Sequence, residues 1–151
     1  MRQSMVKAAA ILALGVSSFA VTSGAVAEEW PLVQGDYWEV TGIDIKDGGS
    51  WKYANWLATE WRKNLDYAVS QGWLKGYKIV SNVYGRSDEP DLYLIRIRED
   101  IPSGAEGERR MKAYEEWSKK TAEQMVGESG NRAEYREVMS SSLLQEMTWR
   151  D

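Results

Sequence analysis

The alternation of apolar and polar residues in residues 37–45 (YWEVTGIDI) most constrains the fold of this chain. A period of two is typical of a β-strand, because successive side chains of a strand point to opposite faces of the sheet. Residues 91–99 (DLYLIRIRE) have the same pattern and the same enrichment in aromatic and β-branched side chains. The chain is therefore predicted to build its core on a β-sheet.

Turn signals and helical spacing organise the segment between these two strands. The turn residues 46–49 (KDGG) precede a predicted helix that ends at Gly72. Residues 74–84 are predicted as a strand that pairs with residues 91–99 in an antiparallel hairpin. The predicted helix has one continuous apolar face, formed by Ala54, Leu57, Ala58, Trp61, Leu65, Ala68 and Val69.

The C-terminal third completes the predicted order. Residues 105–126 are rich in helix formers, residues 127–131 are predicted to break this helix, and residues 132–139 are predicted as a short further helix. Residues 142–150 alternate like a last strand. The order βαββαβ predicts an α+β, ferredoxin-like fold, in which an antiparallel sheet of strand order 4-1-3-2 has helices on one face.

Both faces of the predicted sheet carry apolar side chains. In the first strand, Trp38 and Val40 point away from the face that holds Ile43, and residues 91–99 alternate in the same way. Because helices would cover only one face, the other face indicates a partner, and the simplest partner is a second copy. The sequence therefore predicts a homodimer with facing sheets; a monomer with exposed aromatic side chains is the alternative.

The element order and three segments, YWEVTGIDI, YANWLATEWRKNLDYAVSQGWLKGYKIVSNVY and EPDLYLIRI, resemble a small exported member of the dimeric α+β barrel superfamily. This likeness covers most of the chain after residue 27 and depends on pattern, without a motif diagnostic of one activity. The superfamily includes cofactor-free monooxygenases, lactone isomerases, haem proteins and stress-related proteins. The resemblance therefore implies a barrel dimer with a cleft and no single reaction.

The first 27 residues are predicted to be a secretory signal peptide. A positively charged start precedes an apolar stretch, residues 8–20, and Ala25-Val26-Ala27 presents small residues where signal peptidase cleaves. Cleavage between Ala27 and Glu28 would leave a single domain, residues 28–151, in the periplasm or the medium. No stretch approaches the roughly 18 to 20 apolar residues of a membrane helix, so stable membrane insertion is not expected.

Composition excludes several functional classes. The chain has no His and no Cys, which removes the Ser-His-Asp triad, a thiolate nucleophile, the usual zinc ligands and the axial His of the haem branch. No cofactor and no metal are therefore expected. Removing Arg2 and Lys7 from 19 basic residues leaves 17 against 23 acidic ones, a net charge of −6 that disfavours nucleic-acid binding.

Charged residues inside predicted strands form the first candidate site. Glu39, Arg96 and Glu146 lie on three strands that are neighbours in the predicted order. As catalytic residues, the carboxylates would transfer protons, and Arg96 would stabilise an anionic or carbonyl group. The alternative is a cross-strand ion pair, which contributes about 0.2–1 kcal/mol to stability.

A second face of the first predicted helix supplies candidate ligand contacts. Tyr53, Trp56, Glu60 and Tyr67 lie at positions i, i+3, i+7 and i+14. Together with Arg98 they are predicted to contact a ligand, because aromatic side chains on a second face mark a cleft or an interface. The alternative is a wider buried face of the same helix.

Three functions follow from these features. The first is an exported small-molecule-binding or stress-related protein that acts as a barrel dimer without a cofactor. The second is a cofactor-independent isomerase or monooxygenase-type enzyme acting on a small aromatic or anionic substrate. The third is a structural assembly partner in the envelope.

Overall fold

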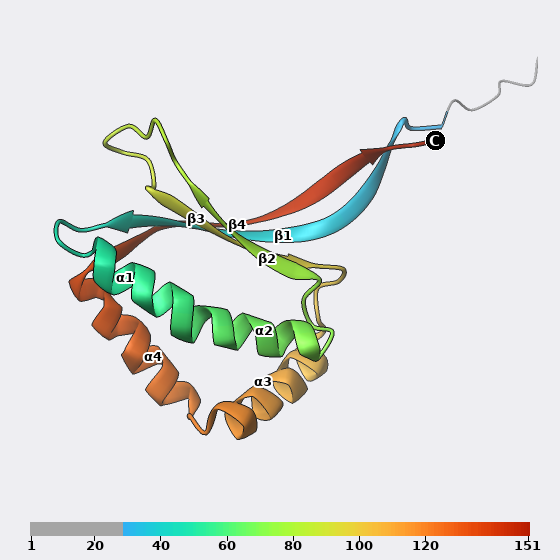
Figure 1. The fold of residues 1–151 in the computed structure, drawn as a ribbon. Helices are drawn as coiled ribbons and strands as arrows, with labels where there is room; N and C mark the ends of the chain where they lie inside the picture. The colour runs from blue at the N-terminus through green and yellow to red at the C-terminus, as the bar shows by residue number, and fades with distance from the viewer. Residues whose placement is uncertain (1–28) are drawn as a thin grey trace, which may run out of the picture.

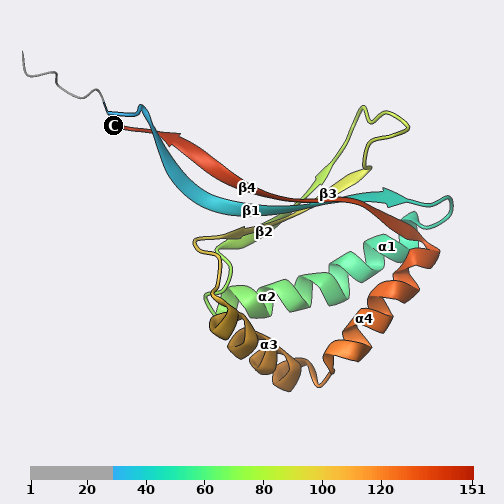
Figure 2. The same cartoon turned by 180° about the vertical axis from the view of Figure 1, so that it is seen from behind.

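The computed structural model describes residues 29–151, so the predicted signal peptide and its cleavage site lie outside the described residues. These residues form an α+β fold in which helices cover one face of a four-stranded antiparallel sheet (Figures 1 and 2). Among them, no helix has the length and apolar character that a membrane crossing needs. The elements are β1 (Leu32–Ile45), α1 (Ser50–Trp56), α2 (Arg62–Ser70), β2 (Gly76–Ser81), β3 (Leu92–Arg98), α3 (Gly104–Ser118), α4 (Ala122–Asn131) and β4 (Arg136–Trp149).

The strand order is β2-β3-β1-β4, which is the predicted order read from the other edge. β1 and β4 have 14 residues each and pair from Leu32↔Trp149 to Ile45↔Arg136. β1 is longer than predicted because its first residues continue past β3 and form a two-stranded ribbon with the end of β4 (Figure 1). β4 is longer because it begins at Arg136, where a helix was predicted. The predicted helix over residues 132–139 is wrong, since only Arg132–Glu134 forms a 3₁₀ turn before β4 begins.

The core lies between the first helical region and one half of the sheet. Ile43 of β1 and Leu94 of β3 are buried on the helix side, which confirms the predicted strand faces. Tyr53 is 1% exposed in this core, and burial raises the pKa of its phenol to about 12. The other buried members of the core are Leu57, Trp61, Leu65 and Leu74.

The first helical region is continuous, with α1 and α2 joined by a π-helical segment, Leu57–Trp61. Three consecutive i+4 steps in a regular α-helix would each turn the buried face by about 40°, and the wider π turn compensates for this drift. The predicted apolar face is therefore wrong at Ala54, Ala58 and Val69, which are exposed. The buried residues recur at every fourth position instead: Tyr53, Leu57, Trp61 and Leu65.

The second predicted helix is two helices. α3 ends at Lys119, which adopts a left-handed conformation with φ of 58°. Thr121 then begins α4 with a capping box, in which its side chain accepts from Gln124 N and the Gln124 side chain accepts from Thr121 N. The predicted break at residues 127–131 is wrong, because these residues lie inside α4.

Gly49 allows the turn between β1 and α1 to approach the start of β4 closely. A Cβ atom at this position would overlap the backbone oxygen of Tyr135 and lie 2.9 Å from that of Lys46. Neither oxygen belongs to a side chain that can rotate away.

Gly49→Ala is therefore expected to lower the free energy of unfolding by about 1–3 kcal/mol, measured by urea denaturation. The control is Gly76→Ala, whose Cβ would meet no atom within 4 Å and which should change stability by less than about 1 kcal/mol. Equal losses in the two variants would contradict the steric explanation.

Candidate functional site

The helix-side face of the sheet has an apolar part and a charged part. Ile43 and Leu94 belong to the core, whereas Glu39, Arg96 and Arg98 lie further along the same strands on the same face. The register pairs Glu39 directly with Arg96. Alternation with a period of two thus brings three charged side chains beneath the helical layer.

Glu39 binds both arginines. Arg96 Nη1 donates to Glu39 Oε1 at 2.9 Å, and Arg98 Nη2 donates to Oε2 at 2.6 Å. The predicted cross-strand Glu39–Arg96 pair is therefore confirmed, with Arg98 added to it. Since each carboxylate oxygen accepts from a guanidinium group, Glu39 fixes the orientation of the two arginines on the sheet.

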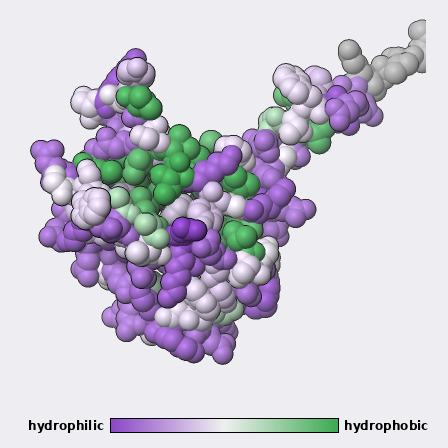
Figure 3. Space-filling model, in the orientation of Figure 1, coloured by the Kyte–Doolittle hydropathy of each residue, from purple (hydrophilic) through white to green (hydrophobic). Residues whose placement is uncertain are grey.

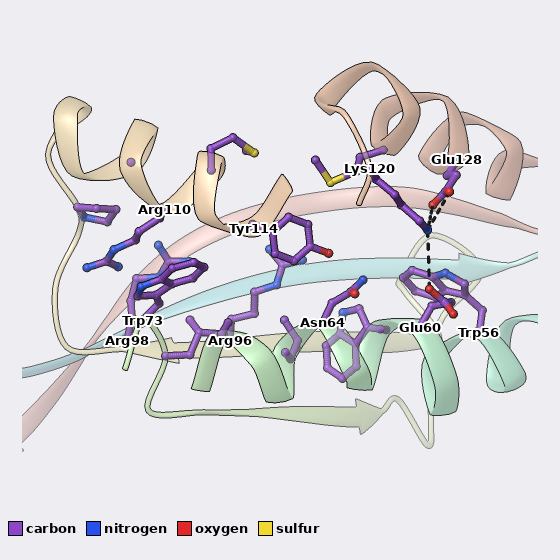
Figure 4. Close-up of a pocket in the computed structure, with 18 of the residues that line it drawn as sticks. Trp56, Glu60, Asn64, Trp73, Arg96, Arg98, Arg110, Tyr114, Lys120 and Glu128 are labelled. Carbon is purple, nitrogen blue, oxygen red and sulfur yellow. Dashed lines mark hydrogen bonds and ion pairs between the residues drawn. The ribbon is translucent and has the colours of Figure 1, made fainter. Parts of the chain in front are cut away.

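A half-open cavity of about 440 Å³ lies beside these arginines, between the α1–α2 region and the α3–α4 pair (Figure 4). Its apolar walls include Leu65, Leu74, Met111 and Met125. Four aromatic side chains also line it, namely Trp56, Trp61, Trp73 and Tyr114. The cavity is thus largely apolar, with charged groups at defined places.

Arg98 and Arg110 lie with Trp73 at one end of the cavity, called here the arginine end (Figure 4). The side chains of Arg98 and Arg110 are 21% and 17% exposed. Arg110 Nε donates to Glu106 Oε1 at 2.5 Å, and Arg109 donates to both oxygens of the same carboxylate. These hydrogen bonds lower the pKa of Glu106 to about 2, and the bonds from Arg109 contribute more to the shift than the bond from Arg110. Glu106 is therefore ionised at neutral pH.

The opposite end of the cavity has balanced charges. Lys120 Nζ lies 2.8 Å from Glu128 Oε1 and 3.8 Å from Glu60 Oε2, and it thereby links α4 with the π segment (Figure 4). The hydrogen bond with Glu128 is the main cause of the raised pKa of Lys120. The Arg132 guanidinium lies over the Trp56 ring, 4.2 Å from its centroid.

An aromatic contact outside the cavity holds α3 against α2. The rings of Tyr67 and Trp117 stack with centroids 4.1 Å apart, and Tyr67 Oη donates to the backbone oxygen of Ala113 at 3.3 Å. Tyr67 was predicted to contact a ligand. In the structure it packs between two helices and lies outside the residues that line this cavity.

The structure brings some of the predicted site residues together and separates others. Trp56, Glu60 and Arg98 line the cavity, and so does Arg96. Tyr53 is instead part of the core, where it stacks on Trp56 with ring centroids 5.6 Å apart. The reason is the i+4 spacing of the buried residues, which the regular helical pattern did not include.

Glu146 lies apart from Glu39 and Arg96. Leu143 of β4 pairs with Glu39, and Glu146 comes three residues later, so alternation turns it to the opposite face of the sheet. Its side chain instead lies against Gly35, where a Cβ atom would be 3.3 Å from Glu146 Cβ. The three predicted catalytic residues therefore do not form one site.

Among the cavity residues that the sequence-based prediction missed are Trp73, Arg110, Tyr114 and Lys120. The mixed charges of residues 106–120 are typical of a solvated helix face. The spacing of Arg110, Met111 and Tyr114 could have indicated the cavity, because it places a half-buried cation beside the few apolar side chains of that helix. Trp73 directly follows Gly72 in the loop before β2 and has no periodic pattern.

The carboxylates around the cavity already have cationic partners. Glu60 and Glu128 pair with Lys120, and Glu39 pairs with two arginines. Within residues 29–151, no three acidic side chains come together in a way that could hold a metal ion. The cavity therefore offers cationic, aromatic and apolar contacts to a ligand.

Comparisons of the chain with protein-family models, with curated proteins and with solved structures give no match. Function is therefore inferred from the geometry of the cavity.

Proposed function

We propose that this protein binds a small organic molecule in the cavity between its helices and its sheet. The observation that carries the proposal is the cavity itself, with a volume of about 440 Å³, largely apolar walls and a few charged groups at its ends. A concave site of a few hundred Å³ with this mixture of walls is typical of ligand-binding sites.

The way the helices pack supports this proposal. Neither α3 nor α4 contributes a fully buried residue, although both helices cover the cavity. Gly107 of α3 lines the cavity, and a Cβ atom there would meet nothing within 4 Å. The two helices therefore border an accessible cleft and do not close over a packed core, which suits the binding of a ligand.

A cofactor-independent isomerase or monooxygenase is less well supported. Such an enzyme needs an acid or base that reaches the substrate. Among the described residues, neither Glu39 nor Glu146 lines the cavity, and Glu60 and Glu128 are paired with Lys120. These positions favour binding without turnover.

Filling the cavity from α3 tests the proposal. N-phenyl-1-naphthylamine, a neutral fluorescent probe, is expected to bind the protein with increased emission. Gly107→Leu should weaken this binding at least about tenfold, because the new side chain occupies the cavity, while its higher helix propensity preserves the fold. Fluorescence titration measures the affinity, and circular dichroism checks the fold.

Gly127→Leu is the matched control for this test. Gly127 is also a helical glycine with nothing within 4 Å of its Cβ position, but it lies on α4 outside the residues that line the cavity. The Gly127→Leu variant should bind N-phenyl-1-naphthylamine with the same affinity as the unaltered protein. Binding that is absent altogether, or unchanged in Gly107→Leu, would contradict the proposal and favour a structural assembly role.

We also propose that the fold is ferredoxin-like and that two copies associate through the sheet face opposite the helices, as in the dimeric α+β barrel superfamily. The helices cover one face only, and Figure 3 shows hydrophobic side chains gathered over the sheet above a mostly hydrophilic helical layer. Trp38 and Val40 of β1 lie on the uncovered face, together with Leu144 of β4, which pairs with Trp38. A second copy would remove these side chains from water.

Two adjacent leucines of β4 provide a matched test of the dimer. Leu144 and Leu143 are 52% and 53% exposed, and they point to opposite faces of the sheet. Leu144→Lys is expected to convert a dimer into a monomer, because it places a charge in the proposed interface, whereas Leu143→Lys should remain dimeric. Light scattering coupled to size-exclusion chromatography measures the mass. A monomeric unaltered protein, or equal behaviour of the two variants, would contradict this interface.

We propose, finally, that the protein acts after export to the periplasm or the medium. The support is the positively charged start, the apolar stretch and the small residues of Ala25-Val26-Ala27 at the N-terminus. Intact-mass measurement of the protein recovered from the periplasm should give a chain that begins at Glu28. Recovery of the full-length chain from the cytoplasm alone would contradict export.

A further inference from the structure

Positive charge exceeds negative charge at the arginine end of the cavity. Asp100 lies 3.8 Å from Arg110 and is 66% exposed, so solvent screens this pair. The ion pairs form two groups: Arg96 and Arg98 pair with Glu39, and Arg109 and Arg110 pair with Glu106 and Asp100. The second group is balanced, and the first leaves one positive charge unmatched.

The opposite end of the cavity has no such excess. Lys120 and Arg132 are two cations, and Glu60 and Glu128 are two anions, among the residues that line that end. Among the charged residues that line the cavity, the excess of cations at the arginine end favours an anionic group of a ligand there.

Arg98 also has a donor that no group in the protein uses. Its Nη2 donates to Glu39, but its Nε is buried and has no hydrogen-bond partner among the described residues. This Nε is too deeply buried for a molecule in the cavity to reach it, but Nη1 of the same guanidinium group is not among the buried atoms and makes no hydrogen bond with the described residues, so it can donate to a ligand. The planar guanidinium group suits a carboxylate, whose two oxygens accept from two neighbouring N–H groups.

The walls next to this charge are flat and apolar. Trp73 lies at the arginine end, and Tyr114 lies between the two ends (Figure 4). Leu65 and Leu74 complete the lining near the core. Aromatic and aliphatic walls of this kind favour a ligand with a planar apolar body.

From this excess charge, unused donor and apolar lining, we infer that the ligand is an aromatic carboxylic acid whose carboxylate binds at the arginine end. This inference depends on the proposed function, because it names the chemical class of the molecule that occupies the same cavity. The acid group is bound by Arg98 and Arg110, and the ring lies against Trp73 and Tyr114.

A pair of equally shaped probes tests the inference by isothermal titration calorimetry at neutral pH. 2-Naphthoate carries a carboxylate, and 2-naphthamide is its neutral counterpart. 2-Naphthoate is expected to bind at least about tenfold more tightly than 2-naphthamide, since only the acid forms charge-assisted hydrogen bonds. Inorganic phosphate should bind more weakly than 2-naphthoate, because it has no apolar body.

Arginine variants locate the carboxylate. Arg98→Gln and Arg110→Gln should each reduce the affinity for 2-naphthoate about tenfold and leave that for 2-naphthamide nearly unchanged. Arg62→Gln is the control, because Arg62 is a 68% exposed arginine of α2 that pairs with Asp66 and lies outside the cavity lining. Circular dichroism and thermal unfolding verify the fold of each variant, and Arg110→Gln alone decides the question if Arg98→Gln does not fold.

The outcomes separate this inference from the proposed function. Equal affinities for 2-naphthoate and 2-naphthamide, both lost in Gly107→Leu, would overturn the acid class and leave small-molecule binding intact. Phosphate that binds as tightly as 2-naphthoate would show a site for simple anions and overturn the aromatic acid. Failure of N-phenyl-1-naphthylamine and both naphthalene probes to bind would overturn the proposed function together with the inference.

Discussion

The carboxylate of Glu39 is the group on which the arrangement of the cavity depends. Two arginines share its face of the sheet, and that face is covered by helices, where an unpaired charge would be strongly unfavourable. By accepting from both guanidinium groups, Glu39 makes the charged part of the face tolerable within the fold. The same pairing fixes where Arg96 and Arg98 can present their remaining donors to the cavity.

The cavity follows from the contrast between the two parts of this face. Over the apolar part, Tyr53, Leu57 and Trp61 bring the first helical region into close contact with Ile43 and Leu94. Over the charged part, α3 and α4 contribute no fully buried side chain, and the guanidinium groups of Arg96 and Arg98 keep their hydrogen bonds to Glu39. The α3–α4 pair is instead held by the Tyr67–Trp117 stack and by Lys120, and the space between these contacts stays open.

The strand-level features could be predicted because they depend on local alternation. The faces of β1 and β3 and the Glu39–Arg96 pair follow from a period of two and from the strand order. The position of Glu146 required the register between β1 and β4, which no local pattern contains and which a bulge opposite this residue further alters. Tyr53 was misplaced for a related reason, since a π segment changes the helical period and only the packed core shows it.

The α3–α4 region was the least predictable part of the site because its function depends on contacts between distant segments. Arg110 is surrounded by charged neighbours in the sequence, and its burial results from β3 and the loop before β2, which come together with α3 only in the fold.

The two faces of the sheet serve separate purposes. Glu39 lies on the helix-covered face, where it holds two arginines of the cavity, while its neighbours Trp38 and Val40 lie on the uncovered face. One strand thus serves two surfaces through alternate residues. A substitution on either surface therefore leaves the other chemically unchanged, and ligand binding and self-association are separable properties of the same sheet.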